Sequence, residues 1–421
     1  MSVPRIAELS QRIAANTATI CEYLSSNDLP YPSLGIDTPL YGAVPDQPEM
    51  QALRQSILDD TAELRQLMLG PRDYLTSFVP NALLPLQAVT RFGLARSLPV
   101  GDETTLSNMA KLSGLTESDT RKVVRYAVAQ KIFEETRPGV ITHSAASRLL
   151  AQDPGVHDYV AACTDELWQA SAQTCNAMEK YPGSEEPTET GFSLANNTDK
   201  PLYDFLSAFP ERSTRFANMM EGFTKGKAFD LKYVMDYYPW QQHGGGTIVD
   251  VGGSQGFVSV ALARRHPSIS FVVQDLEPVI IDAKENVPSD VASQVKFMVH
   301  DFFTPQPVVG ADVYFFRWIF HNWSDKYSIK ILQSLIPALK PGSKVIISDA
   351  VMPPADRVPS GMNLRLRGFD LVMTSIQNAK ERELEDWVNL FRLADERFEF
   401  QGVTQPPGSF NALLVATWRG S

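Results

Sequence analysis

The sequence contains few cysteines and no excess of positive charge. Three cysteines, Cys21, Cys163 and Cys175, are scattered through 421 residues, and such an odd, dispersed set predicts neither a disulfide framework nor a zinc knuckle. Acidic residues number 49 against 38 basic ones, which gives a formal net charge of −11. This balance argues against a general nucleic-acid or anionic-membrane surface, so we expect neither partner.

Long apolar runs are also missing. No stretch approaches the about 18 uninterrupted apolar residues of a membrane-spanning helix, and residues 1–24 lack a basic start followed by an apolar run. We therefore expect a cytoplasmic protein that does not bind membranes. The 421 residues suffice for two domains, each with its own hydrophobic core.

Two phosphate-binding signatures are absent or incomplete. No Gly-x-x-x-x-Gly-Lys-Ser/Thr loop occurs, so the usual cradle for β and γ phosphates is missing. The glycine turn at Gly252, Gly253 and Gly256 lacks the first glycine of a dinucleotide motif, because Val251 stands there. Asp250 precedes the turn, where its negative charge would repel a pyrophosphate but attract a cationic amino-acid end. The turn favours S-adenosyl-L-methionine over a dinucleotide.

The glycine turn lies within a series of alternating apolar strands and helices. Strands are expected at 247–251, 271–275, 295–300, 312–317 and 344–349, with helical segments between them. Two further strands, 398–403 and 411–418, flank the segment QPPGSF and close the chain as a hairpin. This pattern predicts an α/β fold built on a Rossmann-like, doubly wound sheet.

The first half of the chain is predicted to be mainly helical. Apolar residues at helical spacing predict helices over 4–24 and 48–69, the second ended by Gly70 and Pro71. Packing of these helices on the same chain and packing against a second copy are equally open. Further helices are expected over 156–178 and within 201–238, separated by a polar loop at 181–200.

Residues 105–142 have the outline of a winged helix. Helices are expected at 105–112 and 116–130, and short strands at 132–135 and 139–142. The second helix carries Arg121, Lys122 and Arg125, which a DNA-binding regulator would use. Acidic Glu117 and Asp119 lie on the same helix, so we interpret this face as solvated rather than DNA-binding.

Polar and aromatic residues follow the carboxyl ends of several predicted strands, where ligands bind in a doubly wound sheet. Asp275 is placed to accept hydrogen bonds from ribose hydroxyls, Asp301 to bind the adenine amino group and Phe302 to stack on the ring. Each acid alone is also typical of a helix N-cap, but their succession around one glycine turn favours a binding site. His321 follows the fourth strand and Asp349 ends the fifth, which predicts a general base with a supporting carboxylate.

Several segments closely resemble those of the fungal and plant small-molecule O-methyltransferases that use S-adenosyl-L-methionine. The matching segments are DVGGSQG, VVQDLEPVI, HDFF, DVYFFRWIFHNWSD, LKPGSKVIISDAVMP and NAKERELEDW. The resemblance covers nearly all of residues 80–418, and HNWSD in its context is far more specific than the glycine turn. It implies a class I methyltransferase domain behind an N-terminal, mainly α-helical winged-helix domain.

The resemblance also implies roles for individual residues. Cofactor contacts are expected from Gly252, Gly253, Gly256, Asp275, Leu276, Asp301, Phe302 and Arg317. His321 matches the general base, and Asp349 and Glu381 match the two acids that flank it. Acceptor contacts are expected from Trp168, Met219, Met220, Phe223, Asn322, Met373 and Gln377, although Met and Phe at helical spacing are equally typical of a core. No metal site is expected.

These inferences divide the chain into residues 1–75, a helical dimerisation extension; 76–235, a winged-helix and substrate-lining domain; and 236–421, the cofactor-binding domain. We expect an enzyme that methylates a hydroxyl, phenolic in character, of an aromatic or polyketide-like secondary metabolite. It would release S-adenosyl-L-homocysteine and form a homodimer through its N-terminal helices.

Two alternatives stay open: a pericyclase or cyclase on the same scaffold, and a non-catalytic winged-helix regulator. The chain departs from the family at Asn322, where aspartate is usual, and at Asp349, where plant relatives have glutamate. Both departures leave the base itself in place. His321 therefore favours methyl transfer over the rearrangement chemistry of relatives that have lost this histidine.

Overall fold

The computed structural model describes residues 3–42 and 44–420, which form two compact units. The first unit comprises Met1–Trp168, Phe209–Gly222 and Val358–Arg365. The second comprises Gln169–Ala208, Phe223–Arg357 and Leu366–Ser421. Each unit is assembled from segments that are far apart in the sequence. The predicted division at residues 75 and 235 concerns functional parts of the chain and stays a prediction.

Two amphipathic helices begin the first unit, as predicted. They are α1 (Arg5–Ser26) and α2 (Pro48–Thr76), and they share a small core that includes Ile20, Leu24 and Met50. The backbone of α2 leaves helical geometry at Gly70, which has φ 68° and ψ 173°, and a further helical segment follows to Thr76. The break at Gly70 was predicted. Glycine adopts this conformation without the steric penalty of a Cβ.

The predicted winged-helix outline is confirmed for the next part of the first unit. Its elements are α3 (Leu84–Arg91), β1 (Thr104–Thr105), α4 (Leu106–Ser113), α5 (Glu117–Ala129), β2 (Phe133–Arg137), β3 (Val140–His143), α6 (Ala145–Gln152) and α7 (Pro154–Ala162). The strands form an antiparallel sheet in the order β1-β3-β2. Each basic side chain of α5 is ion-paired: Arg121 with Glu117, Lys122 with Asp119, and Arg125 with Glu135.

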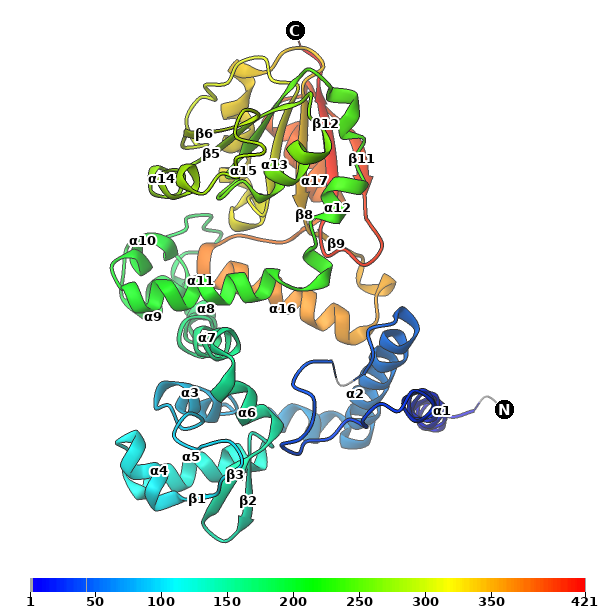
Figure 1. Cartoon of the computed structure of the whole chain (residues 1–421), viewed down its shortest axis with the longest axis vertical. Helices are drawn as coiled ribbons and strands as arrows, with labels where there is room; N and C mark the ends of the chain where they lie inside the picture. The colour runs from blue at the N-terminus through cyan, green and yellow to red at the C-terminus, as the bar shows by residue number, and fades with distance from the viewer. Residues whose placement is uncertain (1–2, 43, 421) are drawn as a thin grey trace. The chain divides into compact units, whose positions relative to one another are not determined.

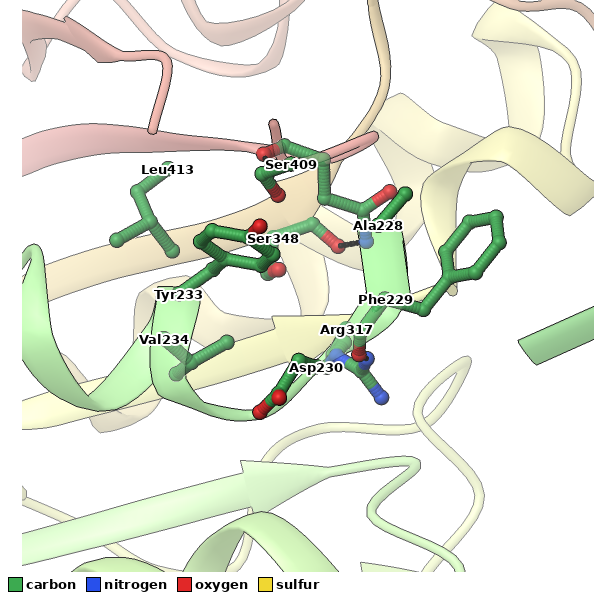
Figure 2. A pocket seen from close by; sticks show the side chains of 10 residues that line it. Ala228, Phe229, Asp230, Tyr233, Val234, Arg317, Ser348, Ser409 and Leu413 are labelled. Carbon is green, nitrogen blue, oxygen red and sulfur yellow. Dashed lines mark hydrogen bonds between the residues drawn. The ribbon is translucent and has the colours of Figure 1, made fainter. Parts of the chain in front are cut away.

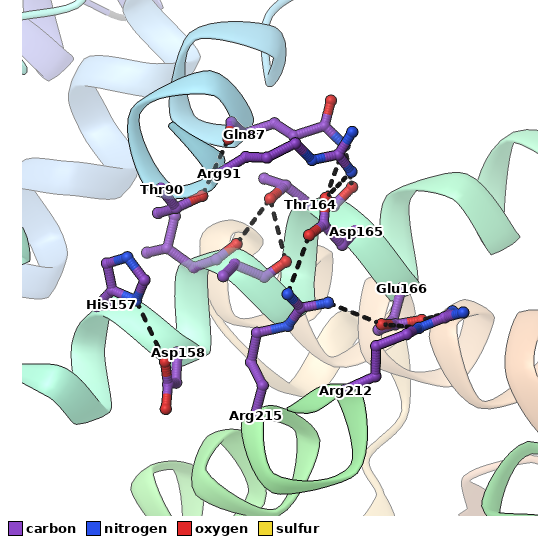
Figure 3. Close-up of polar contacts among 12 residues, drawn as sticks. Gln87, Thr90, Arg91, His157, Asp158, Thr164, Asp165, Glu166, Arg212 and Arg215 are labelled. Carbon is purple, nitrogen blue, oxygen red and sulfur yellow. Dashed lines mark hydrogen bonds and ion pairs between the residues drawn. The ribbon is translucent and has the colours of Figure 1, made fainter. Parts of the chain in front are cut away.

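The helix expected over 156–178 contains one turn of π-helix, η1 (Cys163–Leu167), between α7 and α8 (Trp168–Lys180). This turn carries two acids that hold arginines of α11 (Pro210–Thr224), as Figure 3 shows. Glu166 is buried and accepts from Nε of Arg212 at 2.9 Å and from Arg215 at 3.0 Å. Asp165 pairs with Arg215 at 3.2 Å. A fully paired buried carboxylate fixes one packing of these segments.

The second unit corrects one prediction, because residues 181–200 are not loop throughout. They include α9 (Gly191–Asn196), which begins at a cap where Oγ1 of Thr190 accepts from the backbone N–H of Ser193 at 3.0 Å. A Cβ at Gly191 would lie 2.2 Å from the carbonyl oxygen of Ala170. The turn-like composition hides a helix whose first residue is glycine because α8 lies directly against it.

The predicted doubly wound sheet is confirmed in the second unit. Its strands are β4 (Thr247–Val251), β5 (Ser270–Asp275), β6 (Val295–Val299), β7 (Val313–Arg317), β8 (Lys344–Asp349), β11 (Phe398–Thr404) and β12 (Ala412–Trp418). They lie in the order β11-β12-β8-β7-β4-β5-β6. The pairs from β8 to β6 are parallel, and β12 is antiparallel to both β8 and β11.

Helices cover both faces of this sheet (Figure 1). On one face α15 (Asp325–Leu335) and α17 (Leu384–Ala394) bury Leu332, Trp387 and Phe391 against the strands. On the other, α12 (Lys232–Asp236) and α13 (Phe257–Arg265) bury Val234 and Leu262. Strands buried on both faces are apolar along their whole length, which is why the sequence marks them clearly.

The remaining elements of the chain are short connections and one long helix. They are α10 (Leu202–Ser207), α14 (Glu277–Glu285), α16 (Ser360–Gln377) and a two-stranded parallel sheet of β9 (Val351–Met352) and β10 (Arg382–Glu383). Short 3-10 turns are η2 (Lys227–Phe229), η3 (Trp240–His243), η4 (Phe320–Asn322), η5 (Ile336–Ala338) and η6 (Ala355–Arg357). Within the part of the chain that the structure describes, no helix is both long enough and apolar enough to cross a membrane.

Candidate active site

The glycine turn after β4 leaves no room for side chains. Gly252 has φ 71°, and a Cβ there would lie 2.5 Å from Cδ1 of Ile319. A Cβ at Gly253 would lie 2.6 Å from the carboxyl carbon of Asp250. The N–H groups of both glycines donate to the carbonyl of Gln274, at 2.8 and 3.0 Å. The turn is thus held against the end of β5, and glycine at these positions lets it pack closely against its neighbours.

Asp275 ends β5 beside this turn. Its carboxylate accepts from the backbone N–H of Ser254 at 2.9 Å and from that of Leu276 at 2.8 Å. Burial raises the pKa of Asp275, and the two backbone hydrogen bonds oppose that shift. Gly256, with φ 73°, then starts α13. The acid predicted for the ribose is therefore oriented by the turn itself and retains lone pairs for a ligand's hydroxyls.

Asp301 and Phe302 follow β6 on the same edge. Oδ1 of Asp301 accepts from the backbone N–H of Phe303 at 2.9 Å, and its side chain is exposed. The ring of Phe302 packs edge-on against Trp323 at 6.1 Å, and its Cε1 lies 3.8 Å from where a Cβ of Gly252 would stand. The glycine turn therefore neighbours both the acid that ends β5 and the ring of Phe302. The adenosine site at this edge stays a prediction.

Asp250 and Arg317 lie at the ends of the central strands. Asp250 is buried, and burial raises its pKa to about 6 although Ser259 donates to it at 2.7 Å and Arg317 is positively charged. Nη2 of Arg317 donates to the carbonyl of Phe229 at 2.8 Å, in a small pocket with Tyr233 and other side chains (Figure 2). Arg317 therefore places a fixed positive charge beside two acids, since Asp349 also interacts with it.

His321 lies in a short turn, η4 (Phe320–Asn322), that follows β7. Its side chain is buried, and Nδ1 lies 3.1 Å from Oε1 of Glu381. Its backbone N–H donates to Oδ2 of Asp349 at 3.3 Å. An ionised carboxylate only accepts hydrogen bonds, so the contact with Glu381 keeps the proton on Nδ1 and leaves Nε2 as the basic atom.

The strands β9 and β10 bring the two acids together. Asp349 ends β8, and β9 follows two residues later. In the parallel ladder Arg382 lies opposite Val351, so Glu381 comes next to the end of β8. Oδ1 of Asp349 and Oε2 of Glu381 have no hydrogen-bond partner within the described residues. The predicted base and its two flanking acids thus form one buried group.

Burial alone would lower the pKa of His321, but the hydrogen bond to Glu381 and the charges of Asp349 and Glu381 outweigh it and raise that pKa above 6.5. Burial also raises the pKa of Asp349, to about 6, against the attraction of His321. The imidazole is therefore more basic than a free histidine, although water is excluded from it.

Five aromatic residues pack together beside this group, and two of them contact His321. They form an aromatic cluster, namely Phe223, Phe229, Trp318, Phe369 and Phe410. Of these, only Phe223 was predicted. Trp318 lies edge-on to His321 with centroids 4.8 Å apart, and Phe369 stacks on His321 at 6.3 Å. Phe410 reaches the cluster from the predicted hairpin loop QPPGSF, the one signal that pointed to it.

Trp318 has an unusual backbone conformation, with φ 59°. Positive φ is rare for a bulky side chain and costs of order 1–3 kcal/mol. The indole ring stacks on Phe410 with centroids 5.7 Å apart, and Nε1 has no hydrogen-bond partner within the described residues. The strain turns the indole toward the histidine, so the aromatic cluster is built at a free-energy cost.

The residues predicted to contact the acceptor are divided between the units. Asn322, Met373, Gln377 and Phe223 belong to the second unit, and Trp168, Met219 and Met220 to the first. The amide of Gln377 donates to Oδ1 of Asn322 at 3.0 Å, and that of Asn322 donates to the carbonyl of Trp318 at 3.0 Å. This chain joins α16 to the turn of His321. The acceptor role of all seven residues stays a prediction.

The seven-stranded sheet with helices on both faces is the fold of a class I methyltransferase. Comparison with known proteins agrees, since the O-methyltransferase domain family matches residues 205–395. The chain is 36% identical to the grayanic acid biosynthesis cluster O-methyltransferase of Cladonia grayi, over 99% of this chain and 88% of that one. It is also 36% identical to the chlorophenol O-methyltransferase of Trichoderma longibrachiatum, over 98% and 90%.

Solved structures share the fold. OxaC in complex with sinefungin and meleagrin superposes with a TM-score of 0.75 at 20% identity, covering 98% of each chain. LepI in complex with SAM gives 0.68 at 24%, covering 97% and 99%, and a structure described as a pericyclic reaction enzyme gives 0.68 at 23%, covering 97% and 100%. The chain belongs to the O-methyltransferase family and is an S-adenosyl-L-methionine-dependent O-methyltransferase.

Proposed function

We propose that this enzyme methylates a phenolic hydroxyl of an aromatic, polyketide-like secondary metabolite, with His321 as the general base. The observation that carries the proposal is the 3.1 Å contact between Nδ1 of His321 and Glu381. It leaves Nε2 unprotonated on a buried imidazole whose pKa is raised above 6.5. An imidazole held in this tautomer can take up a phenolic proton at Nε2.

The cofactor supplies a methyl group on a positively charged sulfur. Nε2 of His321 would take up the hydroxyl proton of the acceptor as its oxygen receives that methyl group, and the cofactor would be left as neutral S-adenosyl-L-homocysteine. Asp349 and Glu381 stabilise the imidazolium formed in this step, because Glu381 contacts Nδ1 of the ring and the charge of Asp349 also acts on it. Asp349 acts here in place of the glutamate of plant relatives, and its contact to the backbone N–H of His321 holds the turn.

The cofactor residues have separate proposed tasks. Gly252, Gly253 and Gly256 form the bare turn for the amino-acid end, and Arg317 bounds the far side of the site. Asp275 accepts from the ribose hydroxyls, with Leu276 beside it. Asp301 binds the adenine amino group, and Phe302 packs against the ring. These tasks agree with the bare glycine turn and with the orientation of Asp275 by backbone N–H groups.

The aromatic character of the acceptor is supported by the aromatic cluster around His321. Flat rings bind flat ligands by stacking and edge contacts. The name of the Trichoderma longibrachiatum relative also specifies a phenol. We include Trp168, Met219, Met220, Phe223, Asn322, Met373 and Gln377 among the acceptor contacts.

A pericyclase or cyclase on the same scaffold is the alternative, since one enzyme of similar fold is described as catalysing a pericyclic reaction. The buried base with its acids favours methyl transfer, which requires proton removal. Incubation with methyl-labelled cofactor and a panel of phenols tests the proposal, because a methylated product is heavier by one methyl. An unchanged mass with a rearranged product would overturn it.

Replacement of His321 by Ala tests the base separately. Turnover is expected to fall by roughly 10² to 10⁴, while the affinity for S-adenosyl-L-homocysteine measured by calorimetry stays near that of the wild type. His266→Ala changes a histidine that ends α13, and it serves as the matched control. Unchanged turnover in His321→Ala would remove this residue from the mechanism.

We further propose a homodimer formed through residues 1–75, with 76–235 as the winged-helix and substrate-lining part and 236–421 as the catalytic part. The helices α1 and α2 and the segment after them expose large apolar side chains, which are Ile6, Leu58, Leu67, Met68, Leu75, Phe78 and Val79. Exposed apolar side chains in such number are typical of an interface. A cytoplasmic location is proposed from the three cysteine thiols. Light scattering measures the mass of the particle in solution and tests the homodimer. Cell fractionation tests the cytoplasmic location.

A further inference from the structure

Arg382 lies next to Glu381 and contacts the turn that carries the proposed base. We propose that Arg382 is a positioning residue of the active site. It holds the His321 turn in place relative to Asp349 and Glu381, and its positive charge partly offsets the negative charge of these two acids. This inference rests on the proposed role of His321. Arg382 is completely buried, although arginine is almost never buried without a specific partner.

The guanidinium group uses both of its Nη atoms on the turn. Nη1 donates to the carbonyl of Phe320 at 2.8 Å, and Nη2 donates to the carbonyl of Trp323 at 2.8 Å. These two carbonyls bracket His321 and Asn322. The turn's own closing bond, from the N–H of Trp323 to the carbonyl of Phe320, measures 3.1 Å. Arg382 therefore closes the same turn from outside, at both ends.

The other donors of Arg382 fix the segment that follows the turn. Nε donates to Oδ1 of Asp325 at 2.9 Å, and Nη2 donates to Oγ of the buried Ser328 at 3.0 Å. Asp325 and Ser328 lie in the first turns of α15. Four contacts from one planar group thus determine both the position and the tilt of the His321 turn. A lysine, with one nitrogen and no planar fork, cannot make this set.

Arg382 also belongs to the element that delivers the acids. It pairs with Val351 in the ladder between β9 and β10, while Glu381 immediately precedes it. The central carbon of its guanidinium group lies over the ring of Trp387, 5.3 Å from the ring centroid. The side chain therefore connects the ladder, which sets where Glu381 lies, to the turn, which sets where His321 lies. The 3.1 Å contact between them depends on this connection.

Stability alone does not explain a charge in this place. Burying a guanidinium group carries a desolvation penalty that an apolar residue of the same length would avoid. The carboxylate that pairs with Arg382 is Asp325, which is partly exposed and also bound by Lys380 at 2.7 Å. An apolar side chain would pack against Trp387 but would remove the 2.8 Å donor from both turn carbonyls. Phe320 would keep only the N–H of Trp323 at 3.1 Å, and Trp323 only Oγ of Ser328 at 3.4 Å. Arg382 therefore fixes the geometry of the His321 turn at a cost in desolvation free energy.

The charge of Arg382 acts on the proton equilibria of the site. It lowers the pKa of both His321 and Asp349, against the acids that face the imidazole. The charged groups that act on the ring are Asp349 from β8, and Glu381 and Arg382 from the β10 segment. Two further groups act on these acids. Arg317 of β7 interacts with Asp349, and Asp370 of α16 accepts from the N–H of Glu381 at 2.8 Å. Loss of Arg382 therefore leaves the imidazole more basic.

Two variants separate geometry from charge: Arg382→Met removes both, and Arg382→Lys keeps the charge. Turnover of both variants is expected to fall by roughly 10- to 100-fold, since small displacements of a catalytic group have effects of this size. The affinity for S-adenosyl-L-homocysteine is expected to stay within about twofold of the wild type. In Arg382→Met the midpoint of the acid limb of kcat/KM against pH moves to higher pH, and in Arg382→Lys it stays nearer the wild-type value.

Arg392→Met is the matched control, because Arg392 is exposed on α17. If Arg382→Met does not fold, Ser328→Ala removes one of the four contacts with little change in volume, and a several-fold loss of turnover is then expected. Wild-type turnover and pH profile in Arg382→Met, or in Ser328→Ala where the first variant is unfolded, would overturn the proposal.

The double variant His321→Ala with Arg382→Met distinguishes this inference from the proposed function. If Arg382 acts through His321, the double variant is no slower than His321→Ala alone. Effects that multiply would show that Arg382 does not act through the histidine. If His321→Ala itself retains full turnover, the base assignment fails, and that result is seen independently of Arg382.

Discussion

Nδ1 of His321 lies 3.1 Å from Oε1 of Glu381, a residue 60 positions later in the chain, and both side chains are buried. This contact raises the pKa of the imidazole, together with the charge of Asp349. The base must be neutral to accept a proton, so activity declines as the pH falls through the pKa of His321. The acid limb of the wild-type pH profile is therefore expected to have its midpoint above 6.5.

Glu381→Gln is expected to move that midpoint to lower pH. The neutral amide removes the charge that stabilises the imidazolium, so the pKa of His321 falls and the histidine is neutral over a wider range. Turnover on the plateau is expected to fall by roughly tenfold or more, because the imidazolium loses the stabilisation of a neighbouring negative charge. A loss equal to one pKa unit corresponds to about 1.36 kcal/mol. The measurement is kcat/KM between pH 5 and 9.

Glu385→Gln makes the same chemical change four residues later, on an exposed residue. Its pH profile is expected to overlay that of the wild type. A midpoint in Glu381→Gln that does not move, or that moves upward, would mean that the acid limb reports another group.

Asp275→Asn is expected to weaken the binding of S-adenosyl-L-homocysteine. The carboxylate is oriented by two backbone N–H groups, at 2.9 and 2.8 Å, and an amide has only one oxygen for them and for ribose. Hydrogen bonds to a charged group contribute about 1.5–3 kcal/mol, so the Kd is expected to rise by roughly 10- to 100-fold. Calorimetry measures this change, and Asp290→Asn on the surface is the control. A Kd within twofold of the wild type would remove Asp275 from the cofactor site.

The sequence was sufficient to predict the sheet, the glycine turn and the residues that follow the strands. Strands buried on both faces are continuous apolar runs, and the residue after each strand lies at the ligand edge by topology alone. For this reason Asp275, Phe302, His321 and Asp349 were each located from their distance to a strand. The pairing of His321 with Glu381 came instead from the family resemblance, because no local pattern links residues 60 positions apart.

Apart from Phe223, the members of the aromatic cluster were not predicted from their surroundings in the sequence, and neither was Arg382. Phe369 and Phe223 lie at helical spacings that are equally typical of a hydrophobic core. Arg382 stands among Lys380, Glu383 and Glu385, a pattern that normally indicates a solvated surface. Its burial depends on the tertiary position of the His321 turn. Likewise, α9 lies in a segment of turn-like composition and is capped by Thr190 through a contact that composition does not reveal.

Trp318 offers a test of the aromatic cluster. Trp318→Ala removes the ring that lies 4.8 Å from His321, so the KM for an aromatic acceptor is expected to rise by roughly tenfold. Cofactor affinity is expected to stay unchanged. Trp318→Gly removes the same ring and also tolerates φ 59°. The Gly variant is therefore expected to be the more stable of the two by roughly 1 kcal/mol.

Steady-state kinetics and urea unfolding of the two Trp318 variants separate these effects. Equal KM increases in both would assign the loss to the ring. A KM that stays at the wild-type level in both variants would exclude Trp318 from the acceptor site, whatever their stabilities.

Glu166→Ala is expected to destabilise the first unit. Glu166 is buried and accepts from Arg212 and Arg215, so its removal leaves Arg212 without that carboxylate and forces both arginines to reorganise. Breaking a buried ion pair in this way costs about 3 kcal/mol. Arg215 retains Asp165 at 3.2 Å, which limits the loss. The urea midpoint of the first unit is expected to fall accordingly, while Glu211→Ala on the exposed side of α11 leaves it unchanged. Equal midpoints for the two variants would mean that the ion pairs of Glu166 with Arg212 and Arg215 set the local geometry without contributing to stability.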